Sequence, residues 1–106
     1  MIKPSKVNIL GTVYTITYCD KPSDVAHNGR TSLWGEIDYW DYSIRVYDNS
    51  RSPEALFHTI LHEVIHGICS TLHLDSLHTG DNHDRMDSLA LALTDVFFRN
   101  KWIEWE

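Results

Sequence analysis

Cysteines, basic side chains and long apolar runs are all scarce in this sequence. Its two cysteines, Cys19 and Cys69, are too few for a disulfide framework and are not spaced like the ligands of a zinc finger. No segment approaches the roughly 18 consecutive apolar residues of a membrane span. Residues 1–20 also lack the basic start and apolar run of a signal peptide. We therefore expect a cytoplasmic protein with no membrane partner.

The shortage of basic side chains bears on the possible partners. Nine lysines and arginines stand against 15 acidic residues, and the formal net charge is −6 with neutral histidines. Proteins that bind nucleic acid without regard to its sequence need clustered lysine and arginine to neutralise phosphates. The basic residues here are scattered. The composition therefore argues against a nucleic-acid partner.

Histidine is the residue type that is unusually frequent. The chain has seven histidines among 106 residues, and five of them fall between positions 58 and 78. With 42% hydrophobic residues and several bulky aromatic side chains, a chain of this length builds one hydrophobic core and has no room for two. We therefore expect a single domain over residues 1–106.

The first half of the chain has the composition of β-strands. Four segments are rich in β-branched and aromatic residues or alternate apolar with polar residues: residues 7–10, 12–19, 33–39 and 42–47. Gly11 predicts a bend or bulge between the first two segments, and the last two form a hairpin that turns at Trp40 and Asp41. Residues 20–31 collect proline, Asn-Gly and polar side chains, which predicts a loop. Because a bend or bulge leaves the first two segments in one strand, we predict a three-stranded, mainly antiparallel sheet.

Two helices are predicted in the second half of the chain. Ser52 and Pro53 start the first, because serine is a favoured cap and proline is tolerated in the first turn, and this helix extends to His73. The second begins at Asp81, whose side chain is a predicted cap, and ends near Asn100. Apolar residues of the second helix recur at spacings of three and four and form one stripe facing a core: Met86, Leu89, Ala90, Leu93, Val96 and Phe97. Strands followed by helices predict an α+β fold, with the sheet packed on the first helix.

The first helix carries the motif HEVIH at residues 62–66. At roughly 100° per residue, apolar side chains gather on one side of this helix and histidines on the other. His62 and His66 are one turn apart, so their β-carbons lie roughly 5–6 Å from each other. Their imidazoles can then bind one zinc ion at about 2.0–2.1 Å. Glu63 points to the side of the metal, where it can accept a proton from water as a general base.

The same motif can also arise by chance in a histidine-rich chain, with its two histidines merely solvated or packed in the core. Three features favour a metal site. The motif lies in the middle of a segment that is already predicted to be helical. Its variable positions, Val64 and Ile65, are apolar, and Gly67 directly after it permits close packing.

A catalytic zinc site needs a third protein ligand. The longer motif HExxHxxGxxH would supply it locally, but Cys69 and Leu72 stand at its last two defined positions. His83 is the best candidate, because it lies on the inward stripe of the second helix near its beginning. The alternatives that remain open are Asp87, Asp84, His78 and His73.

Several segments together carry a family resemblance: WGEI (34–37) with SIRV (43–46), the helix TILHEVIH, and the run from His83 through Met86, Leu89-Ala90 and Leu93 to Asn100. In these segments the chain resembles the short zincin-type metallopeptidases that phages and prophages often encode, distant relatives of the SprT-like and ImmA/IrrE-type minimal zincins. Relatives tend to carry glutamate at the position of His83, which implies that His83 is the third ligand. The resemblance also implies a minimal zincin-like domain, zinc as the cofactor, and hydrolysis of peptide bonds with Glu63 as the catalytic residue.

Two functions from different classes follow from these residues. The first is a zinc metallopeptidase that cleaves a peptide or protein substrate in the cytoplasm. The alternative is a catalytically silent, zinc-stabilised protein-binding module of the same fold, because a chain of this length has little beyond the metal-bearing core with which to build substrate subsites. We expect His58 to line the cleft or to act behind the ligands. His78, His73 and Tyr39 are candidates for stabilising an oxyanion, each more consistent with a structural role.

Overall fold

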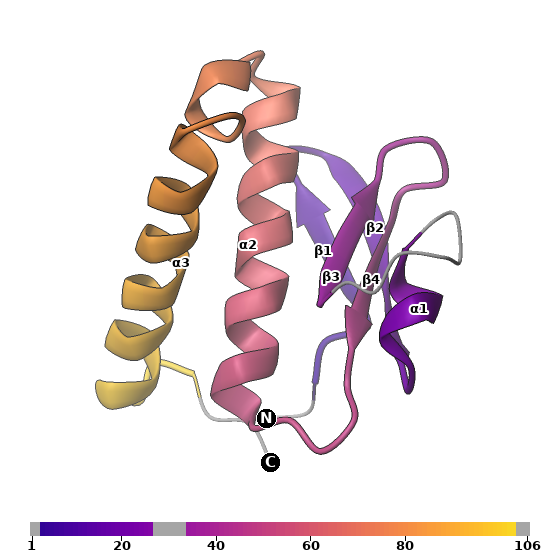
Figure 1. The fold of residues 1–106 in the computed structure, drawn as a ribbon, viewed down its shortest axis with the longest axis vertical. Helices are drawn as coiled ribbons and strands as arrows, with labels where there is room; N and C mark the ends of the chain where they lie inside the picture. Colours follow the sequence, from indigo (N-terminus) through magenta and orange to yellow (C-terminus); the bar gives the residue numbers. More distant parts are fainter. Residues whose placement is uncertain (1–2, 27–33, 104–106) are drawn as a thin grey trace.

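The computed structural model describes residues 3–26 and 34–103, which form one sheet, two long helices and two short helical segments. In chain order the elements are β1 (Lys6–Ile9), β2 (Thr12–Cys19), α1 (Pro22–Val25), β3 (Gly35–Asp38), β4 (Ser43–Tyr47), α2 (Pro53–Thr71), the 3-10 turn η1 (Asp75–Leu77) and α3 (Asn82–Arg99). Figure 1 shows them in layers, with α3 packed on α2 and α2 packed on the sheet. The α+β class predicted from the sequence is confirmed.

The sheet has four strands in the order β1-β2-β4-β3, so the predicted number of three is wrong. β1 does not continue into β2 but folds back on it, with Ile9 opposite Thr12. Leu10 and Gly11 form the two-residue turn, with φ angles of 51° and 96°, and positive φ at both positions is the conformation that suits a tight hairpin. The N–H of Gly11 also donates to Asn8 Oδ1 at 2.7 Å. The bend predicted at Gly11 is therefore a full reversal of the chain.

The strand pairing is mixed, and the prediction of a mainly antiparallel sheet missed the parallel pair at its centre. β1 with β2 and β3 with β4 are antiparallel, but β2 and β4 run parallel, with Ile16 opposite Ile44. The β3–β4 hairpin reverses the chain, so that β4 enters the sheet between β2 and β3. Among the described strands β3 thereby lies at the edge, where it contacts α2. An edge strand is thus placed beside the helix that carries HEVIH.

The segment 20–31, predicted as a loop, contains the short helix α1 on the face of the sheet away from α2 (Figure 1). Val25 is fully buried there, and its carbonyl oxygen accepts a hydrogen bond from Arg45 Nε at 2.7 Å. Composition did not reveal this helix, because proline at its start, Pro22, is as typical of turns as of a first helical turn. Residues 27–31 of the predicted loop and residue 33 of the predicted strand lie outside the described part of the chain.

α2 begins where the sequence predicts. Ser52 Oγ accepts a hydrogen bond from the N–H of Ala55 at 3.2 Å, and Pro53 occupies the first turn. The helix ends at Thr71, two residues before the predicted end. The chain adopts the left-handed conformation at His73, with a φ of 57°, and this conformation cannot continue a right-handed helix.

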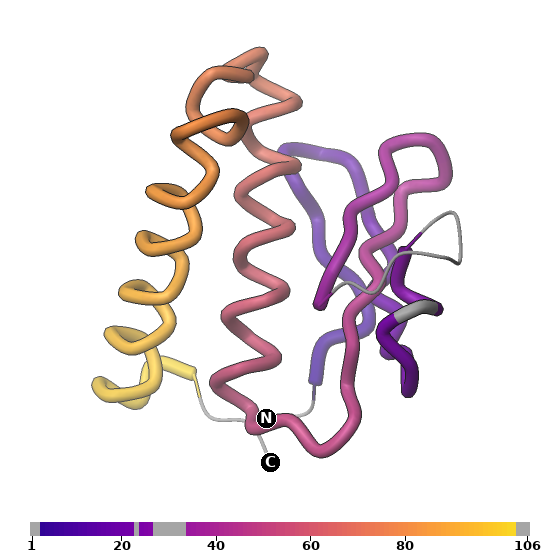
Figure 2. Tube along the Cα trace, viewed as in Figure 1, coloured from indigo at the N-terminus to yellow at the C-terminus, as the bar shows by residue number. Residues whose placement is uncertain are grey.

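α3 runs antiparallel to α2 and lies beside it, as the chain trace in Figure 2 shows. It covers Asn82–Arg99 and is followed by Asn100, close to the predicted end. Asp81 is its N-cap residue, as predicted, but the Asp81 side chain makes no capping hydrogen bond. Met86 and Ala90 of the predicted stripe are buried. Within the described residues, no helix combines the length and apolar character needed to cross a membrane.

The hydrophobic core lies between α2 and the sheet. Leu56 and Ile60 of α2 are buried in it together with Ile9 of β1. Gly67 brings α2 close to the sheet, because a Cβ at this position would lie 2.8 Å from Ile9 Cδ1 and 3.1 Å from Ile37 Cδ1. The apolar side of α2 is therefore held on the sheet, and the side that carries its histidines is left facing α3.

Candidate metal centre

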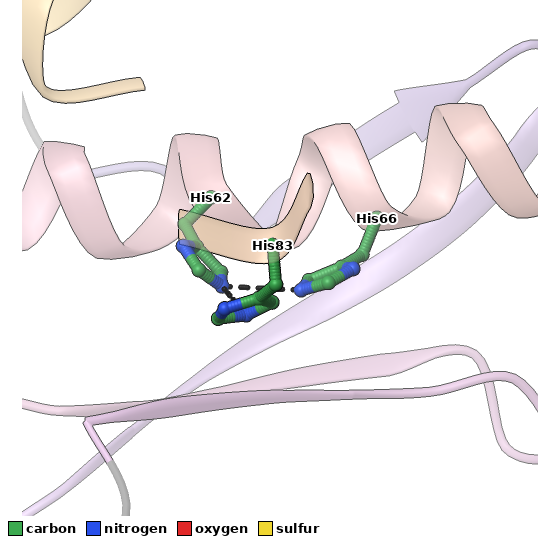
Figure 3. A group of neighbouring side chains, drawn as sticks. All are labelled: His62, His66 and His83. Atoms are coloured by element: carbon green, nitrogen blue, oxygen red, sulfur yellow. Dashed lines mark hydrogen bonds between the residues drawn. The ribbon is translucent and has the colours of Figure 1, made fainter. Parts of the chain in front are cut away.

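Three histidines from two helices converge on one point. His62 and His66 lie one turn apart on α2, and His83 comes from the first turn of α3. Figure 3 shows their imidazole rings turned toward one another. Nε2 of His62 lies 3.1 Å from Nε2 of His66 and 3.1 Å from Nε2 of His83. One ring nitrogen from each of the three lies within 4.8 Å of the others, so the group could hold a metal ion.

This set of donor atoms suits zinc. Tetrahedral coordination with Zn–N bonds of about 2.0–2.1 Å places ligand nitrogens roughly 3.3 Å apart, close to the 3.1 Å that separate Nε2 of His62 from Nε2 of His66 and from Nε2 of His83. Burial lowers the pKa of His62 and, together with the neighbouring histidines, lowers the pKa of His66 to about 4. Both imidazoles are therefore neutral near pH 7, which is the form that binds a metal. Three protein ligands also leave one position of a tetrahedral ion open, as in catalytic sites.

Asp87 contacts the cluster from behind. Its Oδ1 accepts a hydrogen bond from Nδ1 of His62 at 2.7 Å and another from Nε2 of His58 at 2.9 Å. A His62 ring with its proton on Nδ1 directs the lone pair of Nε2 toward the other two histidines. Asp87, one of the alternative third ligands, therefore orients His62 and does not reach the point of convergence. His58 lies behind the ligands, as expected.

The other alternative ligands stand apart from the point of convergence. His73 is exposed beyond the end of α2. Asp84 is fully exposed, with its Oδ1 3.8 Å from Nδ1 of His83. His78 is buried, and its Nδ1 lies 2.7 Å from Nδ1 of His66, the ring nitrogen that faces away from the cluster. Across the described ranges, His83 is the one candidate that joins the pair on α2.

Glu63 lies beside the cluster and is almost entirely enclosed. Only 6% of its surface is exposed, its Oε2 lies 3.8 Å from Nε2 of His62, and its carboxylate accepts a hydrogen bond from the backbone N–H of Ile37 on β3. Burial raises the pKa of Glu63 to about 8, although the hydrogen bond from Ile37 opposes this rise. A cation held by the histidines would lower that pKa, because an opposite charge within about 4–6 Å favours the ionised carboxylate. Glu63 is thus placed to exchange a proton next to the cluster.

Gly35 makes room for Glu63 at the edge of the sheet. A Cβ at this position would lie 2.6 Å from Thr59 Cγ2 and 3.3 Å from Glu63 Oε2. Arg51 in turn holds Thr59, because its Nη2 donates to Thr59 Oγ1 at 2.8 Å. Sequence reasoning placed Gly35 on a strand but missed these contacts of Gly35 and Arg51. Contacts between residues far apart in the chain leave no local signal that would reveal them.

Gly35, His62 and Glu63 line one cavity of about 480 Å³, which reaches from Trp34, just before β3, to His83 and Asp87 on α3. A larger hollow of about 590 Å³ lies between the other ends of α2 and α3, beside Leu91, and contains none of the predicted ligands. We place the candidate site in the smaller cavity, because a functional site is marked by convergent polar and ionisable groups rather than by volume alone.

Comparisons with protein-family models, with curated proteins and with solved structures find no match for this chain. The metallopeptidase family expected from the sequence therefore gains no support from relatives. The structure itself supplies a four-stranded mixed sheet, two long helices and three histidines that could hold a metal ion. Function has to be argued from the chemistry of that site, because one fold hosts many functions.

Proposed function

We propose that this protein is a zinc-dependent metallopeptidase with a minimal zincin-like domain. The observation that carries the proposal is the convergence of three imidazoles from α2 and α3 next to the buried carboxyl of Glu63. His62, His66 and His83 hold the zinc ion, and Glu63 acts as the general base. A peptide or protein is the substrate class that this arrangement suits.

Zinc held by His62, His66 and His83 would supply a Lewis acid for a carbonyl oxygen and would lower the pKa of water. Glu63 takes up a proton from the attacking water at its carboxylate and gives the proton to the leaving amine. The hydrogen bond from the N–H of Ile37 keeps the carboxylate in place during this transfer. His62 and His66 remain neutral, because burial lowers their pKa values, and the carboxylate of Asp87 keeps the single ring proton of His62 on Nδ1.

The edge of the sheet offers a surface for an extended peptide. β3 comes last in the strand order of the described sheet, and its residue Gly35 lines the same cavity as His62 and Glu63. An edge strand presents backbone N–H and C=O groups with which an extended peptide can pair. A substrate that adds to β3 would therefore lie next to the general base and the three histidines.

One observation favours a second function. The carboxyl of Glu63 is buried and accepts a hydrogen bond from the N–H of Ile37, and this contact would also tie α2 to β3 in a protein that cleaves nothing. Under this alternative the protein is a catalytically silent, zinc-stabilised protein-binding module. Under the first function Glu63 takes part in peptide hydrolysis, and under the second it only joins α2 to β3. The histidines bind zinc under both.

Zinc content and peptide hydrolysis in the parent protein and in Glu63→Gln test the proposal. We expect about one zinc ion per chain by elemental analysis. We also expect hydrolysis of a mixture of unstructured peptides, which Glu63→Gln lowers by roughly 10²–10⁴-fold, the usual contribution of a general base. Zinc content stays unchanged, because glutamine keeps the size of the side chain and Glu63 is not a ligand. Glu54→Gln, at the exposed start of the same helix, is the matched control and leaves both quantities unchanged.

The outcomes separate the two functions. Hydrolysis that survives Glu63→Gln would contradict the catalytic role of Glu63. Zinc bound without hydrolysis of any peptide would favour the binding module. A parent protein that takes up no zinc, even when zinc is supplied, would contradict both.

A further inference from the structure

His66 contacts another histidine through each of its ring nitrogens. Nε2 lies 3.1 Å from Nε2 of His62 within the cluster, and Nδ1 lies 2.7 Å from Nδ1 of His78. A separation of 2.7 Å between two ring nitrogens is that of a hydrogen bond, in which one nitrogen carries the proton and the other accepts it. The rings of His66 and His78 are tilted at 59° and are not stacked, which agrees with a contact in the plane of the nitrogens.

Coordination through Nε2 sets the positions of the protons on both rings. A neutral imidazole has a single N–H, so a His66 that binds zinc through Nε2 carries its proton on Nδ1. Nδ1 of His66 then donates, and Nδ1 of His78 accepts. His78 consequently carries its own proton on Nε2.

The side chain of His78 is buried and makes a single hydrogen bond within the described part of the chain. The residue is 7% exposed, and its Nε2 has no hydrogen-bond partner among the residues that the structure describes. The carboxylate of Asp75 lies 3.8 Å from that nitrogen, beyond hydrogen-bonding range. His78 is also outside the group of ring nitrogens that could hold the metal. Among the described residues, the one hydrogen bond of the His78 side chain is therefore made to the ring nitrogen of His66 that faces away from the cluster.

The segment that carries His78 is held by its own hydrogen bonds. The backbone N–H of His78 donates to the carbonyl of Asp75 at 3.3 Å, at the end of η1. The side-chain amide of Asn82 donates to the carbonyl of Ser76 at 2.7 Å. The first bond lies within the connection between α2 and α3, and the second ties that connection to the beginning of α3. The connection therefore presents a fixed acceptor to Nδ1 of His66.

We propose that His78 is a positioning residue for the metal site, which accepts the Nδ1 proton of His66 and thereby directs the lone pair of His66 Nε2 toward the point where the three histidines converge. The acceptor for Nδ1 of His62 is the carboxylate of Asp87, whereas the acceptor for Nδ1 of His66 is the imidazole of His78. The two ligands of HEVIH are thus held from behind by unlike groups, one on α3 and one on the connection before it. This inference rests on the proposed metal site and does not require peptide hydrolysis.

The test compares the zinc affinity of the parent protein with that of three variants, by competition with a chromophoric chelator. His78→Leu removes the acceptor and keeps a similar volume, and we expect its zinc affinity to fall roughly 10–100-fold, the usual effect of losing such a partner. His78→Asn places an amide oxygen near the position of Nδ1 and restores the affinity to within about threefold of the parent. His73→Asn changes an exposed histidine in the same connection and is the matched control.

A second measurement separates hydrogen bonding from packing. In the zinc-loaded, ¹⁵N-labelled parent, we expect a scalar coupling between Nδ1 of His66 and Nδ1 of His78 across the hydrogen bond, and a proton on Nε2 of His78. Absence of that coupling, or a His78→Asn variant that binds zinc as weakly as His78→Leu, would overturn the role of His78. Parent-like affinity in His78→Leu would overturn it while leaving the zinc site standing. A parent protein that binds no zinc would contradict both the role of His78 and the proposed zinc site.

Discussion

At the scale of single residues, His62 and His66 each have a partner for the ring nitrogen that faces away from the cluster. A neutral imidazole binds a metal through one nitrogen only if the proton is kept on the other. Asp87 does this for His62 at 2.7 Å, and the same carboxylate oxygen also accepts from His58 at 2.9 Å. His62 is therefore held from α3, so the packing of the two long helices bears directly on the orientation of its ring.

Asp87→Ala should weaken zinc binding. Removal of the carboxylate leaves Nδ1 of His62 without its acceptor, so the affinity for zinc should fall roughly 10–100-fold. Asp87→Asn keeps one oxygen as an acceptor, so its affinity for zinc should fall less. Competition with a chelator measures both. Asp95→Ala, an exposed acid about two turns further along α3, is the control for the loss of charge, and an equal decrease in that variant would show that Asp87 acts through its charge alone.

At the scale of elements, α2 and β3 approach each other where the strand has no side chain. The space that a side chain at Gly35 would need is taken by Thr59 Cγ2 of α2. Thr59 cannot move aside easily, because its Oγ1 donates to the carbonyl of Ala55 at 3.2 Å and accepts from Arg51 at 2.8 Å. Its β-branched side chain also has few allowed rotamers. The spacing between β3 and α2, and with it the space around Glu63, therefore depends on Gly35.

Gly35→Ala should lower the free energy of unfolding by about 1–3 kcal/mol, the usual cost of overpacking a core. Urea unfolding of the metal-free protein measures it. The clash is with Thr59 Cγ2, so Thr59→Ser, which keeps the hydroxyl, should recover most of the loss when the two substitutions are combined. A neutral Gly35→Ala, or a double variant in which the two single losses simply add, would contradict the tight contact.

At the scale of the whole molecule, α3 is the outermost layer. α2 packs on both the sheet and α3, whereas α3 makes its main contacts with α2 and η1. As a result α3 keeps apolar side chains in solvent, with 56% of Leu89 and 40% of Val96 exposed. Both belong to the stripe that the sequence predicts to face a core, and the prediction is wrong at these positions because α3 is covered on one side. A zinc ion shared by α2 and α3 would tie this outer helix to the rest of the fold.

Zinc should therefore stabilise the whole protein. An ion that binds only the folded state adds about 2.7 kcal/mol when its free concentration is a hundred times the Kd. The midpoint of thermal unfolding should rise with zinc, return to its original value with a chelator and change little with magnesium, which prefers oxygen ligands. His83→Ala should lose most of this gain but keep its metal-free stability, because its side chain is 44% exposed. An equal gain in His83→Ala would show that the ion does not join the two helices.

Local rules of helix geometry and capping were enough to predict part of the site from the sequence. Residues four apart lie on the same side of a helix, so the approach of His62 to His66, with Glu63 between them in the chain, follows from spacing alone. Ser52 and Pro53 marked the start of α2, because capping acts within a single turn. The α+β class likewise followed from strand-like and helix-like patterns, each of which is read within a few residues.

Tertiary structure alone decided how these parts meet. Because α3 and the connection before it pack on α2, His83 reaches His62 and His66. For the same reason Asp87 contacts Nδ1 of His62, and His78 contacts Nδ1 of His66. The reversal at Gly11 and the parallel pairing of β2 with β4 also depend on partners distant in the chain. The distance between two packed helices is set by the side chains at their contact, and no spacing within one helix encodes it. A hydrogen bond of 2.7 Å between side chains of different elements is therefore visible only in the folded protein.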